Sequence, residues 1–154
     1  VGCIGNSVHE ALLKSLLSVG FTLPKKGILL STGTIKTKAD LLESIRKLNG
    51  KNALYATAGT HDFLLLNGIE TIKVHWPSSS EEPNAIKLMQ QGKIDLVINI
   101  PKSNEEKELL NDYAIRRTAV DFNIPLMTNA QLAKLFIDAY TENKTLEIKE
   151  WGEY

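Results

Sequence analysis

The sequence predicts an α/β fold, with a doubly wound, mostly parallel central sheet flanked by helices. Short apolar runs such as Ile28-Leu29-Leu30 and Leu96-Val97-Ile98 are typical of strands that are buried on both faces. Segments of about ten to fifteen residues with helical patterning separate these runs. Because parallel strands are joined by right-handed crossovers, the helices are expected to cover both faces of the sheet.

The first half of the chain alternates helix and strand signals. Ser7-Val8-His9-Glu10 has the spacing of a capping box, and Gly20 and Pro24 end the periodic run that follows it. This first helix is expected to pack outside the sheet or to lie at a boundary with a preceding domain. We then expect a strand at 28–30, a helix over 37–48 closed by Asn49-Gly50, a strand at 53–57, and a short helix from near Thr60 to Asn67-Gly68.

The second half continues the alternation and shows no internal repeat. Asp95-Leu96-Val97-Ile98-Asn99-Ile100 is its clearest strand pattern, and Leu146-Glu147-Ile148-Lys149 alternates as an edge strand would. The remaining expected elements are a strand at 69–75, a loop over 76–83, a helix over 84–91 ended by Gly92, a charged loop over 102–107, a helix to about 122, a strand at 124–128 and a helix over 130–140.

Length and composition predict one compact domain and exclude several classes of protein. The 154 residues are 43% hydrophobic, and 18 basic residues balance 18 acidic ones, so no net charge draws in a nucleic acid or a membrane. The single cysteine, Cys3, excludes an internal disulfide and a cysteine-cluster metal site. Without a spanning run or a secretory signal, we expect a soluble cytoplasmic protein, or one of the mitochondrial matrix in a eukaryote. The start without methionine suggests a piece of a longer polypeptide.

Ligands of open α/β sheets bind outside the carboxyl ends of the strands, which here directs attention to the loops 31–38, 57–61, 76–83 and 99–107. Thr57-Ala58-Gly59-Thr60 joins a strand to a helix start through a glycine that lets a ligand approach the main chain. Unpaired backbone N–H groups and two hydroxyls there suit a phosphate or carboxylate. In the alternative interpretation, Thr60 is an ordinary N-cap and Gly59 a tight turn.

Other loops at the same edge supply further candidates. Lys36 and Lys38 follow the first strand and either serve the same anion or are solvated surface charges. Trp76 opens a polar loop and would cover a ligand or rest on the domain edge. Asn99 offers an amide to the cavity or holds the next loop, which also contains the candidate Lys107.

Two further groups of residues are candidates for binding or chemistry. Arg116 and Arg117 are neighbours in a predicted helix, so one of them should face inward or toward a partner domain; a salt bridge is the simpler interpretation. His61 and His75 flank the expected cavity but have no acidic residue at metal-ligand spacing, so no metal site is predicted.

Taken together, several motifs resemble a known family. The motifs are Ala56-Thr57-Ala58-Gly59-Thr60, Gly92-Lys93-Ile94-Asp95, Ile115-Arg116-Arg117 and Ile124-Pro125-Leu126-Met127-Thr128-Asn129. Over about residues 1–140 the chain resembles the methylglyoxal-synthase-like domain, above all the version at the C-terminus of the carbamoyl-phosphate synthetase large chain. The resemblance divides the chain into a boundary helix and linker, 1–26, and a regulatory domain, 27–154.

The resemblance implies an allosteric domain that binds a small anionic effector and does no chemistry itself. Thr57 and Thr60 would hold the phosphate or carboxylate, Lys36 or Lys38 would assist, and Asn99 would reach the rest of the ligand. Relatives with a Trp-Pro-Ser stretch like that at Trp76 respond to acetylglutamate, whereas nucleotide-responsive relatives have lysine there. The effector would be N-acetylglutamate-like, UMP or IMP, or ornithine.

The parent enzyme implied by the resemblance makes carbamoyl phosphate from glutamine, bicarbonate and ATP, for arginine or pyrimidine biosynthesis. It would use ATP with Mg or Mn outside this domain and would work with a glutaminase subunit or domain. No cofactor is expected in this domain. Arg116 and Arg117 would contact the rest of the synthetase.

Two alternatives from other functional classes stay open. True methylglyoxal synthases, which are lyases, resemble the stretch 54–60, but they carry a histidine-aspartate pair in the first loop where this chain has Thr32-Gly33. The Gly-Gly-Asp pattern of those enzymes is also missing after Trp76, where Glu81 and Glu82 stand instead. The third class is an interdomain or oligomerisation module that binds no effector.

Overall fold

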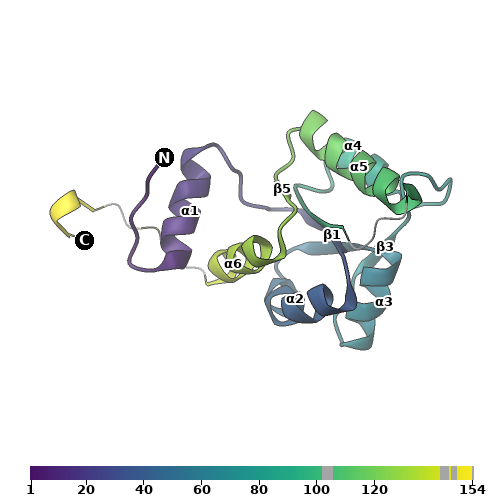
Figure 1. Cartoon of the computed structure of the whole chain (residues 1–154), viewed down its shortest axis with the longest axis horizontal. Helices are drawn as coiled ribbons and strands as arrows, with labels where there is room; N and C mark the ends of the chain where they lie inside the picture. The colour runs from purple at the N-terminus through teal and green to yellow at the C-terminus, as the bar shows by residue number, and fades with distance from the viewer. Residues whose placement is uncertain (102–105, 143–145, 147–148, 154) are drawn as a thin grey trace.

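The central feature of the computed structural model is a five-stranded parallel sheet with the strand order β3-β2-β1-β4-β5 (Figure 1). The structure describes residues 1–101, 106–142, 146 and 149–153, without the side chains of Lys107 and Trp151. All six residues of β1, at the centre of the sheet, are buried, as expected for a strand covered on both faces. The predicted doubly wound α/β fold is confirmed.

Helices and strands alternate along the chain in the predicted order. The elements are α1 (Val8–Ser18), β1 (Gly27–Thr32), α2 (Ile35–Leu48), β2 (Ala53–Thr57), α3 (Ala58–Leu66), β3 (Ile72–Val74), α4 (Ala85–Gln90), β4 (Leu96–Ile100), α5 (Glu106–Asp121), β5 (Leu126–Met127), α6 (Ala130–Thr141) and the 3-10 helix η1 (Trp151–Glu153).

Each face of the sheet has its own hydrophobic core. The α2, α3 and α6 helices cover one face, where Phe136 of α6 is completely buried. The α4 and α5 helices cover the other face, where Met89 and Ile115 pack together with Leu29 of β1 (Figure 1). Because β1 and β4 lie side by side while their following helices leave toward opposite faces, their carboxyl ends flank a crevice between the two helical layers.

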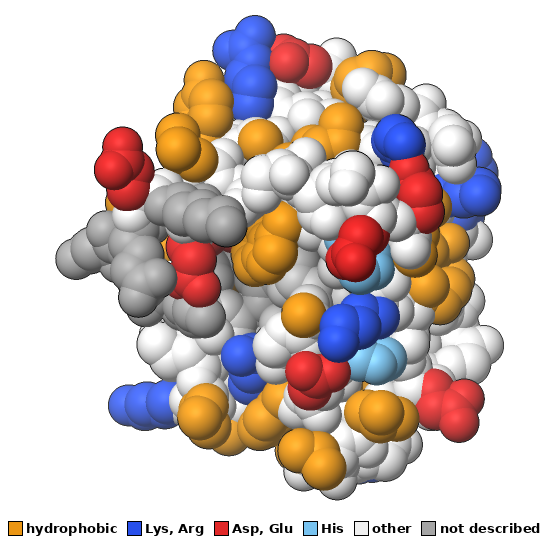
Figure 2. Space-filling view, turned by 90° about the vertical axis from the view of Figure 1, so that its right-hand side faces the viewer, with side chains coloured by type: hydrophobic (Ala, Val, Ile, Leu, Met, Phe, Trp, Pro, Cys, Tyr) orange, Lys and Arg blue, Asp and Glu red, His pale blue; other side chains and the backbone are white. Residues whose placement is uncertain are grey.

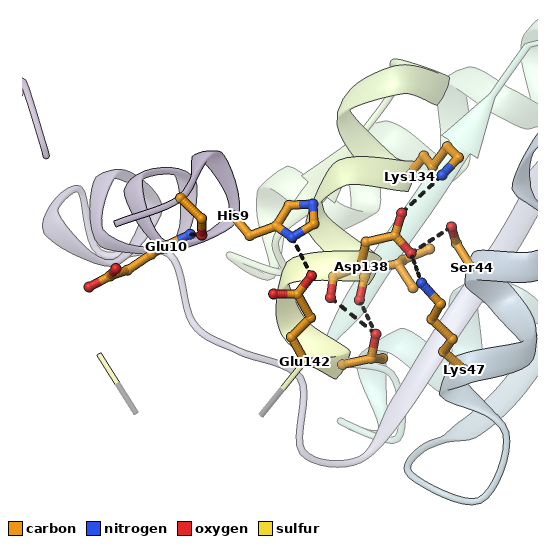
Figure 3. Close-up of polar contacts among 10 residues, drawn as sticks. His9, Glu10, Ser44, Lys47, Lys134, Asp138 and Glu142 are labelled. Atoms are coloured by element: carbon orange, nitrogen blue, oxygen red, sulfur yellow. Dashed lines mark hydrogen bonds and ion pairs between the residues drawn. The ribbon is translucent and has the colours of Figure 1, made fainter. Parts of the chain in front are cut away.

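The first helix forms an additional layer on α6, as the sequence suggested. Leu13 of α1 is buried in the core that α1 shares with α6. His9 of α1 contacts Glu142 just after α6 (Figure 3). Ser7 is the N-cap, accepting a hydrogen bond from the backbone N–H of Glu10 at 3.2 Å. The second half of the predicted capping box differs, because the Glu10 carboxylate accepts from the backbone N–H of Asn6.

A buried carboxylate joins α6 to α2. The Asp138 side chain accepts hydrogen bonds from Ser44 Oγ at 2.9 Å, Lys47 Nζ at 2.6 Å and Lys134 Nζ at 3.0 Å (Figure 3). Burial alone would raise the pKa of this carboxyl, but the three hydrogen bonds outweigh it and lower the pKa from 3.8 to about 2. Asp138 is therefore an ionised carboxylate that holds two helices together.

Two strands are shorter than predicted, and one physical reason explains why both start late. The predicted strand at 69–75 is observed only as Ile72–Val74, and that at 124–128 only as Leu126–Met127. The backbone N–H of Ile69 donates to Leu64 O, and that of Ile124 donates to Ala119 O. These bonds close the left-handed turns at Gly68 and Asn123 that end the preceding helices, so both amides are unavailable to the sheet.

Half of the predicted edge strand at 146–149, residues 147–148, lies outside the described residues, and Leu146 and Lys149 are not in a strand. Among the described residues, no helix is both long enough and apolar enough to cross a membrane.

Candidate functional site: a cavity at the carboxyl edge of the sheet

A small cavity lies where the sequence analysis expected a ligand, outside the carboxyl ends of β1 and β2. Its volume is about 40 Å³. This space holds a few waters or a carboxylate or phosphate group. Figure 2 views the molecule from this side and shows side chains of both charges, histidines and hydrophobic groups on this face. The lining residues are Ser31, Thr32, Gly33, Lys38, Thr57, Gly59, Thr60, Trp76, Ile100, Glu108 and Asp112.

One wall of the cavity is the N-terminus of α3. Thr57, the N-cap, has an extended backbone, and its side chain makes no capping hydrogen bond. The Thr57 hydroxyl instead contacts Ser31 Oγ at 3.4 Å, across the β1–β2 pair. The first N–H groups of a helix have no partner within the helix and carry partial positive charge, so this end of α3 suits an anion.

Thr60 does not occupy the N-cap position of α3. It lies inside the first turn of α3 rather than at its N-cap, so the N-cap interpretation of Thr60 is wrong. Its Oγ1 accepts a hydrogen bond at 3.1 Å from the backbone N–H of Thr32, and the residue is buried. Thr60 therefore lines the cavity and also fastens α3 to β1.

The structure distinguishes the two candidate lysines. Lys38 is buried and lines the cavity, and its Nζ lies 3.7 Å from the position that a Cβ on Gly59 would occupy. Lys36 is exposed and does not line the cavity. Lys38 precedes the buried Leu41 and Ile45 at helical spacing, whereas Lys36 lies two positions away and points elsewhere. This register was the sequence signal that could have selected Lys38.

Trp76 forms a half-buried wall of the cavity and packs on the core beneath α4. Asn84, the N-cap of α4, donates from Nδ2 to the carbonyl oxygens of Trp76 at 3.1 Å and Ser79 at 3.2 Å. The backbone N–H of Ser78 donates to Asn111 Oδ1 of α5 at 3.1 Å. These bonds fix the loop that carries the indole.

Asn99 is next to the cavity but not among its lining residues. It is completely buried at the end of β4, in register with Ser31 of β1. Asn99 Nδ2 donates to Asp112 Oδ1 at 2.7 Å, and Arg116 Nη1 donates to Asn99 Oδ1 at 2.8 Å. The amide thus joins β4 to α5, and its reach toward a ligand stays a prediction.

The two arginines face different ways, as expected for neighbours on a helix, which point about 100° apart. Arg116 points inward to Asn99, and Arg117 makes an exposed ion pair with Asp121 at 2.9 Å. The salt-bridge interpretation therefore describes Arg117. Contact with another domain stays a prediction for both.

Glu108 and Asp112 were missed by the sequence analysis, although both line the cavity. They belong to the inner face of α5, because the buried Ile115 and Ala119 follow them at helical spacing. This helical spacing is visible in the sequence and could have identified both residues. The candidate Lys107 cannot be placed in the same way, since its side chain is outside the described residues.

The histidines at this edge have local partners. His61 Nδ1 is 2.7 Å from Thr71 Oγ1, and His75 Nδ1 is 2.8 Å from Glu81 Oε2. Within the described part of the chain, no three histidine, cysteine or acidic side chains gather as metal ligands would.

Asp95 of the Gly-Lys-Ile-Asp motif lies away from the cavity, at the amino ends of the strands. Its Oδ2 accepts hydrogen bonds from the backbone N–H groups of Lys25 and Lys26 at 2.7 and 2.9 Å. That aspartate has a structural role.

Comparison with known proteins places this geometry in a family. A solved methylglyoxal synthase from Elizabethkingia anophelis NUHP1 superposes with a TM-score of 0.54, covering 75% of this chain and 79% of its own, at 24% sequence identity. That likeness supports the fold alone. The chain is similar to the multifunctional protein URA2 of Saccharomyces cerevisiae, at 42% identity over 97% of this chain. It is also similar to human mitochondrial carbamoyl-phosphate synthase (ammonia), at 39% identity over 100% of this chain.

The chain spans only 7% of the length of the yeast relative and 10% of the human one. The multifunctional protein CAD of Squalus acanthias is 37% identical over 90% of this chain, which spans 7% of its length. The family model for the MGS-like domain matches residues 40–128, more than half of the chain. This match includes α3, Trp76, Asn99 and the inner face of α5. The chain therefore belongs to the family of MGS-like domains.

Proposed function

We propose that this MGS-like domain is the effector-binding regulatory domain of a carbamoyl-phosphate synthase. Its relatives that carry the domain are much longer proteins, one of them named as a carbamoyl-phosphate synthase. The effector is a small anion of the class of N-acetylglutamate or a nucleoside monophosphate, or it is ornithine, which carries a carboxylate although its net charge is positive. ATP, Mg or Mn and the glutaminase belong to the remainder of the synthetase, and this domain performs no reaction.

The observation that carries the proposal is the convergence of positive groups at one end of the cavity. The N-terminus of α3 has no side-chain cap, and the ammonium group of Lys38 lies beside Gly59. Ser31, Thr57 and Thr60 add hydroxyl groups around the same space. Helix N–H groups, an ammonium group and hydroxyls are the donors that bind a carboxylate or phosphate in proteins.

Regulation requires the effector to bind two conformations of the synthetase unequally, typically with a coupling free energy of about 1–3 kcal/mol. The transmitting elements proposed here are α1, which packs on α6, and α5, which carries Arg116 and Arg117. The inner face of α5 lines the cavity, so a ligand contacts this helix directly. The exposed Arg117 is the stronger candidate for contact with another domain, because Arg116 is engaged with Asn99.

The experiment is a titration of the 154-residue chain with N-acetylglutamate, UMP, IMP, ornithine and inorganic phosphate, followed by calorimetry. Lys38→Met should weaken binding of the preferred anion by about tenfold or more, because a charge-assisted hydrogen bond is lost. Lys36→Met is the matched control, since it removes the same charge from the exposed side of α2, and binding should stay within about twofold. Equal effects of the two substitutions would refute the proposed site.

The two carboxylates in the cavity justify a direct test of the lyase alternative. A general base must lie within reach of the substrate proton, and Glu108 and Asp112 are acidic groups at the cavity surface. An assay of methylglyoxal formation by the purified chain separates the two functions. The regulatory proposal expects no product above the uncatalysed rate, and turnover abolished by Asp112→Asn would overturn it.

A further inference from the structure

The outer face of α5 carries a row of four exposed side chains, here called the α5 stripe. In chain order they are Glu106, Leu110, Tyr113 and Arg117. Leu110 is 62% exposed and Tyr113 is 60% exposed, although both are large apolar side chains. The spacing of four, three and four residues places the stripe on one side of the helix, in the pattern by which helices pair along a seam.

The α5 stripe has the composition of a protein–protein contact. The other side of α5 provides the buried Ile115 and Ala119 to the core, so the stripe is not needed to attach the helix to the sheet. Single exposed apolar residues are common, but adjacent ones bordered by charges mark interaction surfaces. Tyrosine and arginine are also among the residue types that dominate binding at interfaces. The charges at the two ends of the stripe indicate which partner fits it.

The α5 stripe is complementary to itself when two copies of the helix run antiparallel. Glu106 precedes Leu110 by four residues, and Arg117 follows Tyr113 by four. The register that places Leu110 opposite Tyr113 of a second copy therefore also places Glu106 opposite Arg117 of that copy. A two-fold axis repeats each contact, so two apolar contacts at the centre are flanked by two pairs of opposite charge. A parallel pairing would instead bring like charges together at both ends.

We propose that α5 pairs with α5 of a second copy of this chain, antiparallel and about a two-fold axis that passes between Leu110 and Tyr113. Arg117 already contacts Asp121 at 2.9 Å, and its five N–H donors allow it to keep that contact while it meets Glu106 of the second copy. A helix of this length, about 24 Å, buries less than the roughly 1,600 Å² of a standard interface, so the self-association is weak. This proposal goes beyond effector binding and does not depend on it.

Sedimentation equilibrium of the 154-residue chain tests the pairing. Over about 10 μM to 1 mM, the mean mass should rise from the 17.1 kDa of one chain toward twice that value. Glu106→Arg and Arg117→Glu should each raise the dissociation constant of the dimer about tenfold or more, because each places like charges together at both ends of the pair. A mass that stays at 17.1 kDa at every concentration overturns the proposal, including the case in which the stripe binds a different protein.

Recombining the reversed charges identifies the register. An equimolar mixture of the two single variants, and separately the double variant Glu106→Arg with Arg117→Glu, should regain association to within about threefold of the wild type, since opposite charges face each other again. The controls Glu43→Arg and Lys36→Glu make the same changes of charge at exposed positions of α2 and should leave the dissociation constant unchanged.

The apolar centre of the pair has its own test. Tyr113→Ser should weaken association about tenfold or more, whereas Leu66→Ser, at an 88% exposed position of α3, should not affect it. Both side chains are exposed, so neither change should alter the circular dichroism of the folded chain. A dimer that Tyr113→Ser and the single charge reversals leave intact, or no recovery in either the mixture or the double variant, overturns the proposal.

Discussion

Removing the buried charge of Asp138 tests the energetics of this fold most sharply. Asp138→Asn keeps the size and shape of the side chain but removes the anion that Lys47 and Lys134 contact from two helices (Figure 3). The aspartate is only 8% exposed, whereas the two lysine side chains are about half exposed. The substitution therefore removes a buried negative charge, while the two lysines that lose their partner stay partly in contact with water.

The pKa of Asp138 gives the size of the expected change in the free energy of unfolding. Its value falls from 3.8 to about 2 in the folded protein. Each pKa unit corresponds to about 1.4 kcal/mol, so the ionised form adds about 2 kcal/mol to the free energy of unfolding at pH 7. Because the folded pKa is lowered, this stability is fully present above pH 3.8 and is lost as the pH falls through about 2.

Urea unfolding of the wild type and Asp138→Asn at pH 7 and at pH 2–3 measures this effect. The difference in unfolding free energy should be about 2 kcal/mol at pH 7 and should shrink toward zero at about pH 2. The matched control is Asp121→Asn, which removes an exposed ion pair with Arg117 and should cost no more than about 0.5 kcal/mol. Equal costs for the two substitutions, or a cost for Asp138→Asn that does not change with pH, would refute this reasoning.

Two other substitutions test the packing and the network at the cavity. Gly27→Ala should destabilise the chain by about 1–3 kcal/mol in urea unfolding, because its Cβ would lie 2.5 Å from Lys93 O; Gly2→Ala, with nothing within 4 Å, should be neutral. Arg116→Met should cost about 1–3 kcal/mol because it leaves Asn99 Oδ1 unpaired in the core, whereas Arg117→Met should cost less than about 1 kcal/mol. Similar melting temperatures for the two arginine variants would contradict the inward role of Arg116.

The candidate site illustrates where sequence reasoning succeeds. Thr57, Gly59, Thr60 and Trp76 were all predicted at the carboxyl edge of the sheet, and all four line the cavity. They could be predicted because each follows a recognisable strand, and parallel strands bring their carboxyl ends to one edge. Whether they bind an effector stays a prediction.

What the sequence by itself determined is the order of the elements and the layered fold, since apolar runs and helical periods are local signals. The late starts of β3 and β5 have a local cause, because the amides of Ile69 and Ile124 are taken by the turns at Gly68 and Asn123 before them. Tertiary structure alone placed Asn99 against Asp112 and Arg116, and brought Lys38 and Glu108 to one cavity from opposite faces of the sheet. These pairings join segments far apart in the sequence, so they depend on how the helices pack around the sheet and not on any local pattern.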